Sequence, residues 1–490
     1  MNSNILYNEK NDNLYILLYQ IGEGAFSTVW FTYEISNFMR DVIKKKISTN
    51  NIIINARALK VHNDDAYKEG MLETKINDII IYNNKKSELI NYPLSFFIID
   101  DEIVIIVYEL ALGSLYDILK KFDKNLDADF VTKIIPDMIN SIKFIHQCGY
   151  IHTDIKPENF LLMGISNEQE NLLSYIKKNK LLDNFKKLSS NKKYNELYEN
   201  IKKYVYDFLN DISTKFKLSN NILEENNSNS NNSDDNSDDN SDNTNCSSYD
   251  SDYNEYDQKL DIFHVEEILN FIKKRTKMNN VKEIDNKIDN KIDNKNLEKE
   301  RNNIKTYMIK PKIKLTDFGC IKKNGSLCQT VQTRYYRSPE VILGLNYNYE
   351  SDLWSFGCSI YELLTGKILI DIDKDIKIDE YDKDLINLKI ILERICNNNN
   401  SINDLFKLIK KSNRSNYIIN NNTEFVYMLP ILSNNLSQNS MLSLKYYKNI
   451  KKNSIIEEIN QLQKLTNSQK ENYIKILGST LQIIAKNRLF

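Results

Sequence analysis

The chain has 490 residues, of which 41% are hydrophobic, and its formal net charge is −1. This length is enough for one two-lobed enzyme with insertions or for two or three separate domains. A nearly neutral charge argues against a strongly basic nucleic-acid-binding protein and against a polybasic membrane anchor. We therefore expect no direct contact with nucleic acid or with a membrane, and we also expect a monomer.

The sequence also predicts an intracellular protein, located in the cytoplasm, the nucleus or both. Its polar N-terminus shows no signal peptide, and the apolar run Ile103–Ala111 is too short to cross a bilayer. No two cysteines have the C-x-x-C spacing, which argues against a zinc site and a disulfide scaffold. The cysteines are Cys148, Cys246, Cys320, Cys328, Cys358 and Cys396.

Apolar segments along the chain predict a β-rich region followed by an α-rich region. The expected strands cover residues 14–19, 29–33, 58–61, 96–100 and 103–108, and a helix over residues 67–81 interrupts them. From Gly113 onward apolar residues recur at helical spacing, for example between Val131 and Ile145. The predicted fold class is therefore α+β, with a β-rich lobe over 15–111 and an α-rich lobe over 112–163 and 308–490.

Residues 164–307 break this pattern, and we expect them to form a spacer within the α-rich lobe. Residues 225–252 are almost entirely Asn, Ser and Asp, and they lack the apolar surface that offsets chain entropy, so we expect disorder there. Helical patterns flank this tract over 182–216 and 263–274. An Ile-Asp-Asn-Lys repeat that begins at Ile284 is interpreted as a codon-repeat expansion. A second insertion, over 34–55, separates two expected strands.

The most informative segment is Tyr150–Asn159. It places Asp154, Lys156 and Asn159 at the spacing of a phosphotransferase catalytic loop. In such a loop Asp154 would accept a proton from the substrate hydroxyl, Lys156 would neutralise the γ-phosphate and Asn159 would hold Mg²⁺. An acid beside a lysine on a loop is often an ordinary surface pair, so the other motifs must decide between the two interpretations.

A glycine turn between two expected strands predicts a phosphate-binding loop, with a plain hairpin turn as the alternative. Gly22 and Gly24 carry no Cβ, so the backbone can approach phosphate oxygens there. A strand follows the turn, whereas a dinucleotide site would place a helix there. The candidate nucleotide-binding residues of this loop are Ile21, Gly22, Glu23, Gly24, Ala25, Phe26, Ser27, Thr28 and Val29.

Lys60 lies on an apolar strand, where an unpaired charge is costly. We expect it to contact the α- and β-phosphates of ATP and to be supported by a glutamate on a helix. Glu69 and Glu73 lie one turn apart on the same helix face, and we favour Glu73. The alternative is a surface lysine on an edge strand. Ala58, on the same strand, is a further candidate for contact with the nucleotide.

The strand that ends at Ala111 stops where a connection between two lobes would offer backbone groups to adenine. We expect these groups to belong to Glu109 and Ala111, with Tyr108 at the back of the pocket and Leu161 as a further contact. The alternative is a core strand with a bend, and both descriptions can hold together.

Acidic residues of the second half complete the predicted phosphotransfer site. Asp317 opens an Asp-Phe-Gly tripeptide after an apolar strand, and we expect it to hold Mg²⁺ together with Asn159. Asp352 opens a later helix and is expected to hold the backbone of the catalytic loop.

The segment 332–340 is expected to hold the catalytic loop in place. Thr333 is a candidate catalytic residue that would hydrogen-bond to Asp154 and Lys156. Glu340 is expected to form a buried ion pair with Arg488.

Together these motifs resemble the eukaryotic protein kinase family over residues 15–163 and 308–390. Three features resemble the SR-protein kinase branch: Gly-x-Gly-x-Phe-Ser-Thr-Val-Trp from Gly22, His-Thr-Asp-Ile-Lys-Pro-Glu-Asn from His152, and the polar spacer after that loop. The segment 332–340 is similar to the group of cyclin-dependent, CDC-like and dual-specificity tyrosine-regulated kinases. The resemblance implies a two-lobed kinase fold, ATP and Mg²⁺ as cofactors, and phosphorylation of Ser and Thr in protein substrates that are Arg/Ser-rich.

The chain departs from the family pattern at several places. Thr153 replaces the arginine that normally binds an activation-segment phosphate, which implies activity without phosphorylation of that segment, as in SR-protein kinases. The acidic run 371–384 is either a solvated loop or, as the resemblance implies, a docking patch for Arg-rich substrates. Residues 397–453 match no known part, with loops expected in their Asn-rich stretches, and the last kinase helix is expected to be missing after Phe490.

Two alternative functions remain open at this point. A catalytically inactive kinase-fold scaffold would bind partners and would be expected to have lost one of Lys60, Asp154, Asn159 or Asp317, whereas all four are present. In the other alternative, the acidic Ser-rich spacer is the main interaction element and regulates the kinase body.

Overall fold

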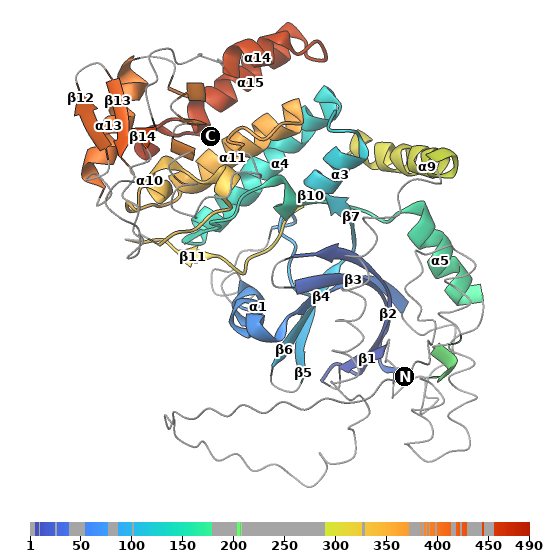
Figure 1. The fold of residues 1–490 in the computed structure, drawn as a ribbon. Helices are drawn as coiled ribbons and strands as arrows, with labels where there is room; N and C mark the ends of the chain where they lie inside the picture. Colours follow the sequence, from blue (N-terminus) through green and yellow to red (C-terminus); the bar gives the residue numbers. More distant parts are fainter. Residues whose placement is uncertain are drawn as a thin grey trace, which may run out of the picture. The chain divides into compact units, whose positions relative to one another are not determined.

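The computed structural model describes two compact units of the chain (Figure 1). The first comprises residues 1–22, 30–57 and 171–288, and the second comprises residues 23–29, 58–170 and 289–490. The described residues are 5–8, 10–24, 27–38, 54–76, 87–99, 102–178, 203–205, 207, 290–325, 329–371, 384, 387–388, 390–391, 393–396, 399–412, 418–421, 424–428, 443–444 and 455–490.

In the first unit the strand order is β1-β2-β3-β4, and β1 and β2 are antiparallel. These strands are β1 (Ile5–Asn8), β2 (Asn13–Glu23), β3 (Ser27–Ile35) and the first residues of β4 (Ile54–His62). Large aromatic side chains of this unit are fully buried, including Tyr15, Trp30 and Tyr33. β2, β3 and β4 confirm the strands expected over 14–19, 29–33 and 58–61.

In the second unit, β4 continues and the strand order is β4-β6-β5. β5 (Ser95–Ile99) and β6 (Ile103–Glu109) form an antiparallel pair in which Ile99 lies opposite Ile103. This pair confirms the expected hairpin. Helix α1 (Tyr67–Thr74) ends before the predicted limit at 81, and residues 77–81 lie outside the described part.

α1 packs closely against β6 because Gly70 has no side chain. A Cβ at Gly70 would lie 2.8 Å from Cβ of Val104 and 3.0 Å from Cγ of His62. Any larger residue would therefore push the helix away from the strand. This close approach places Glu73, one turn further along α1, against the strands.

The helical part of the second unit begins with β7 (Ala111–Ser114), α3 (Leu115–Lys121) and α4 (Ala128–Gln147). The side chains of α4 that we expected to face the core, from Val131 to Ile145, are buried. The Asp127 carboxylate accepts hydrogen bonds from the backbone N–H groups of Asp129 and Phe130 and so caps this helix.

Two small sheets carry the segments that flank the catalytic loop. β8 (Tyr150–Ile151) pairs with β11 (Lys322–Lys323), while β9 (Phe160–Met163) lies between β7 and β10 (Ile313–Leu315). β9 and β10 are antiparallel, with Leu162 opposite Ile313. The predicted spacer therefore begins after β9 and ends shortly before β10, and these two strands are neighbours in the sheet.

Two helices are described within the predicted spacer, α5 (Asn167–Lys178) and α9 (Asn290–Ile309). α9 packs on α3 through apolar contacts of its buried Ile304 and through polar contacts. Glu300 pairs with Lys121 at 2.6 Å, and Arg301 pairs with Asp123 at 2.6 Å. The expected disordered tract 225–252, the helical pattern 263–274 and nearly all of 182–216 lie outside the described residues.

The remainder of the second unit is built around α11 (Glu350–Thr365), whose side chains are nearly all buried. The other elements are α10 (Pro339–Ile342), α13 (Asn399–Lys411), β12 (Ile418–Asn421), β13 (Glu424–Met428), β14 (Ser443–Leu444), α14 (Ile455–Gln461) and α15 (Asn467–Thr480). The expectation of loops in the Asn-rich parts of 397–453 was wrong in part, since α13 begins within the run of Asn residues. Among the described residues, no helix is long and apolar enough to cross a bilayer.

A buried ion pair joins α10 to the last residues of the chain, as expected. Arg488 donates from Nη1 and Nη2 to the two carboxylate oxygens of Glu340 at 2.6 and 2.8 Å. Its side chain is fully buried, its Nη1 also donates to the carbonyl of Glu350, and its guanidinium lies 5.0 Å from the ring centre of Trp354. This bidentate pair ties two distant segments to the start of α11.

We expect Arg488→Ala to lower the free energy of unfolding by about 3–5 kcal/mol, because it leaves the buried Glu340 carboxylate without a partner. Urea denaturation followed by circular dichroism measures this change. The matched control is Lys486→Ala, because Lys486 is exposed nearby. An equal, small effect of the two substitutions would contradict a structural role for the pair.

Candidate active site

The ammonium group of Lys60 lies between two carboxylates from distant parts of the second unit. Its Nζ is 2.7 Å from Oε2 of Glu73 on α1 and 2.8 Å from Oδ1 of Asp317, which follows β10. Glu73 also accepts a hydrogen bond of 2.5 Å from the hydroxyl of Tyr108, and Nε2 of His62 lies 3.3 Å from its Oε2. The structure thus brings together Lys60, Glu73 and Asp317, and the contact is to Glu73 rather than Glu69.

The charges of this group support one another. Burial alone would lower the pKa of Lys60, but the carboxylates of Asp317 and Glu73 outweigh it and raise that pKa above its ordinary value. Burial would raise the pKa of Glu73, yet Lys60 and His62 hold it below its usual range. The Lys60 ammonium lowers the pKa of Asp317 to about 2. All three groups are therefore charged at neutral pH.

The backbone of the catalytic loop is held by Asp352 on α11. Its carboxylate accepts hydrogen bonds from the N–H groups of His152 at 2.8 Å and Thr153 at 2.9 Å, as the sequence predicted. Thr153 has a left-handed backbone with φ of 66°, which is rare for a β-branched residue. The hydroxyl of Thr153 donates to the carbonyl of Cys320 at 2.7 Å, so this side chain also binds the segment that follows Asp317.

The side chains of Asp154, Lys156 and Thr333 form one hydrogen-bonded group. The hydroxyl of Thr333 donates to Oδ1 of Asp154 at 2.7 Å and accepts from Nζ of Lys156 at 3.0 Å. Nζ of Lys156 also lies 2.7 Å from Oδ2 of Asp154. Burial would lower the pKa of Lys156, but Asp154 outweighs it and raises the pKa. The group presents a carboxylate and an ammonium side by side, as acceptance of a hydroxyl proton beside a phosphate requires.

Asn159 and Asp317 together fit a magnesium site. Nδ2 of Asn159 donates to the backbone carbonyl of Asp154 at 2.7 Å and to its Oδ2 at 3.2 Å, so the amide oxygen is the atom left for a cation. The Asp317 side chain is 40% exposed, and its Oδ1 accepts from Lys60. Among the described residues no cluster of three or more His, Cys, Asp or Glu could hold a metal. Mg²⁺ needs only a few protein oxygen ligands, because water and phosphate complete its coordination shell.

The predicted glycine loop lies at the turn from β2 to β3. Ile21, Gly22 and Glu23 end β2, whereas Ser27, Thr28 and Val29 begin β3. The N–H of Gly24 donates to the carbonyl of Ser27 at 2.8 Å, which closes the turn. Ala25 and Phe26 lie outside the described residues, and the phosphate contacts of the loop stay predictions.

The predicted adenine contacts lie at the junction of two strands. Glu109 ends β6 and Ala111 begins β7, while Leu161 lies opposite Ser114 on the neighbouring β9. The Glu109 side chain forms an ion pair of 2.5 Å with Lys314 of β10, which fixes the junction. Ala58 is buried on β4. The contacts of these residues with a nucleotide stay predictions.

The sequence alone did not identify His62 and Gly70 as part of this site. His62 lies between the carbonyl of Val104, 3.2 Å from its Nδ1, and the carboxylate of Glu73. Gly70 lets α1 approach β6. The only available signal was a glycine one turn before Glu73 in a helix that carries no other glycine.

Comparisons with known proteins agree with this geometry. The family model for the protein kinase domain matches residues 15–183 and 299–489. The chain belongs to the protein kinase family. This family membership confirms the prediction from the motifs, including the two-lobed α+β fold class, and it identifies an ATP-dependent protein serine/threonine kinase.

The kinase shares low to moderate sequence identity with known protein kinases. It is 30% identical over 388 residues to the serine/threonine-protein kinase L205 of Acanthamoeba polyphaga mimivirus, covering 73% of this chain and 68% of that protein. It is 24% identical over 364 residues to the protein kinase dsk1 of Schizosaccharomyces pombe, covering 73% and 62%. The match to prp4 of the same yeast is 31% over 169 residues, covering 34% and 31%.

A buried carboxylate that the sequence did not reveal holds the segment that carries Thr333 in place. Asp384 accepts hydrogen bonds from Arg334 at 2.8 Å and Arg337 at 2.7 Å. Arg337 also donates to the carbonyl oxygens of Val331 and Gln332. The sequence pattern places Asp384 in an acidic run that is either solvated or docks substrates. That assignment is wrong for this residue, which is 5% exposed, while residues 372–383 lie outside the described part.

We expect Asp384→Asn to lower kcat/KM of the kinase by about tenfold, because two partly buried arginines lose their counter-charge beside Thr333. Steady-state kinetics on a basic protein substrate measure the change, and circular dichroism verifies folding. Asp371→Asn, at an exposed position of the same acidic run, is the matched control. If both variants keep wild-type kinetics, the ion pairs do not position this segment.

Proposed function

We propose that this kinase transfers the γ-phosphate of ATP to Ser and Thr hydroxyls of protein substrates that are rich in arginine. The observation that supports phosphotransfer most directly is the hydrogen-bonded group of Asp154, Lys156 and Thr333. Asp154 accepts the proton of the substrate hydroxyl, and Lys156 neutralises the transferred phosphate. Thr333 holds both side chains in this arrangement.

The nucleotide-binding residues have separate roles in this proposal. Lys60, oriented by Glu73, contacts the α- and β-phosphates. Asn159 and Asp317 hold Mg²⁺, which neutralises the phosphate oxygens when it is bound. Backbone groups of Glu109 and Ala111 bind adenine, and the loop 21–29 covers the phosphates. The kinase body would comprise residues 15–163 and 308–490, with 164–307 as a spacer, in an intracellular monomer.

The alternative of an inactive scaffold finds no support in the site. An inactive protein has no reason to retain two pairs of charged or amide side chains, because buried charges are costly. Here Lys60 is paired with both Glu73 and Asp317, and Asn159 is hydrogen-bonded to Asp154.

The arginine-rich substrate class rests on the resemblance to SR-protein kinases. It depends on the glycine loop sequence from Gly22 to Trp30, the catalytic loop sequence from His152 to Asn159 and the position of the spacer. Acidic residues between Asp371 and Asp384 would attract positively charged substrates, with Asp384 itself excluded because it is paired internally.

We expect Asp154→Asn to reduce kcat on an Arg/Ser-repeat peptide by roughly 10²–10⁴-fold, the loss typical of a removed general base. Transfer of labelled phosphate from ATP and Mg²⁺ measures this, with the exposed Asp65→Asn as the control. Near-wild-type turnover of Asp154→Asn would refute the assigned role. Labelling of a generic basic protein but not of the Arg/Ser peptide would keep the kinase and reject the substrate class.

We also expect the kinase to be active without phosphorylation of the segment 317–340. Thr153 replaces the arginine that would bind such a phosphate, and Arg334 and Arg337 already have Asp384 as counter-charge. Treatment with a protein phosphatase, followed by removal of the phosphatase and an activity assay, tests this. Complete loss of activity would contradict it.

A further inference from the structure

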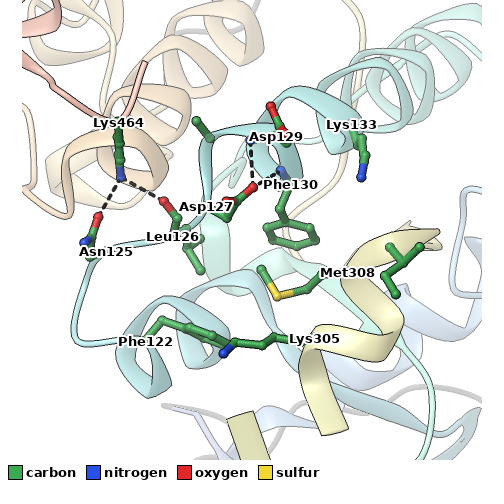
Figure 2. Close-up of a pocket in the computed structure, with 12 residues that line it drawn as sticks. Phe122, Asn125, Leu126, Asp127, Asp129, Phe130, Lys133, Lys305, Met308 and Lys464 are labelled. Carbon is green, nitrogen blue, oxygen red and sulfur yellow. Dashed lines mark hydrogen bonds between the residues drawn. The ribbon is translucent and has the colours of Figure 1, made fainter. Parts of the chain in front are cut away.

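A pocket of about 500 Å³ lies in the second unit, apart from the residues of the active site (Figure 2). The connection from α3 to α4, the first turns of α4, the last turn of α9 and Lys464 form its walls. None of the catalytic or nucleotide-binding residues named above lines it. One wall of this pocket therefore exists only because α9, which belongs mainly to the spacer sequence, packs there.

The floor of the pocket is apolar. Figure 2 shows Phe130 and Met308 facing each other between α4 and α9, with Phe122 beside them. Phe130 and Met308 are buried, whereas Ile309 at the end of α9 is 66% exposed. An exposed aliphatic side chain at the edge of an apolar floor is typical of a surface that binds another apolar group.

Lysines surround this floor without carboxylate partners among the described residues. Lys133 and Lys305 are exposed, and no ion pair joins either to the part of the chain that the structure describes. Nζ of Lys464 donates only to neutral oxygens, Oδ1 of Asn125 at 3.1 Å and the carbonyl of Leu126 at 2.9 Å. Burial lowers the pKa of Lys464, and the nearby Asp127 carboxylate offsets only part of this effect.

The two acidic residues of the pocket are hydrogen-bonded to neutral donors and keep their charge. Oδ1 of Asp127 accepts from the backbone N–H groups of Asp129 and Phe130 at the start of α4. Oδ1 of Asp129 accepts from Nε2 of Gln469 at 2.9 Å. Downstream of α9, Lys310 and Lys312 are exposed and extend the positive charge beyond Lys305. The five lysines thus outnumber the two carboxylates, and this excess of positive charge around the apolar floor favours a negatively charged ligand.

We propose that this pocket is a docking site for an acidic peptide segment of a partner protein that carries bulky apolar side chains. An apolar side chain of the partner occupies the floor between Phe130, Met308 and Ile309. Carboxylates on either side of it pair with Lys133, Lys305 and Lys464. An aliphatic and aromatic floor below a basic rim matches alternating apolar and acidic side chains. The proposal does not depend on the identity of the phosphorylated substrate.

Selection of peptides on the full-length kinase tests this site. A phage-displayed library of random 12-residue peptides is panned on the wild-type protein, and the selected peptides are measured by fluorescence anisotropy. We expect Asp or Glu together with Leu, Ile or Phe in the selected sequences. The double variant Lys133→Glu/Lys305→Glu should bind them about tenfold more weakly or worse. Ile309→Ser, at an exposed position that folding tolerates, should also weaken binding.

The control is Lys367→Glu/Lys475→Glu, which makes the same change of charge at exposed lysines that do not line the pocket. It should bind the peptides as wild type does, and all variants should keep wild-type phosphotransfer and melting temperature. Selected peptides that are basic, or that bind the pocket variants with unchanged affinity, would overturn the proposal. So would pocket-dependent binding of a single-stranded oligonucleotide in place of the peptides.

Discussion

The partly buried ammonium group of Lys60 is the constraint on which the site depends. Its charge is tolerated only because carboxylates from α1 and from the segment after β10 reach it within 2.8 Å. Each carboxylate must lie within hydrogen-bonding distance of Nζ of Lys60. The Glu73 side chain is short, so α1 must lie close to the strand that carries Lys60. Gly70 satisfies this demand, since any Cβ there would meet Val104. The need to pair Lys60 with Glu73 thus favours a glycine at position 70 of α1.

The strand pairing around the catalytic loop explains how the kinase accommodates a long spacer. The chain leaves β9 after Met163 and returns on β10 at Ile313, and these antiparallel neighbours place Leu162 opposite Ile313. The ends of the insertion are therefore held together whatever lies between them. Because the entropy of loop closure grows only slowly with length, many residues can be inserted at this point with little loss of stability. Asn159, just before β9, and Asp317, just after β10, therefore keep their positions in the active site whatever the length of the insertion.

Much of the fold and of the site was predictable because its signals are local. The strands β2 to β6 follow from runs of apolar residues, and Asp154, Lys156 and Asn159 follow from spacing within one loop. Asp384 and His62 were not predictable, since their partners, Arg334, Arg337 and Glu73, depend on how separate segments pack. An acidic residue in an acidic run has the same local pattern whether it is solvated or buried. Only the neighbouring arginines distinguish the two cases.

Internal contacts order the segment after Asp317, although Thr153 replaces the arginine that is usual before the catalytic Asp. Thr153 contributes no charge, but its hydroxyl binds the carbonyl of Cys320 while its N–H binds Asp352. At the other end of the segment, Asp384 compensates both arginines. A phosphate that bound these partly buried arginines would have to displace Asp384 and leave that buried carboxylate unpaired. Since an unpaired buried charge is costly, the internal pairs make the phosphate unnecessary for ordering the segment.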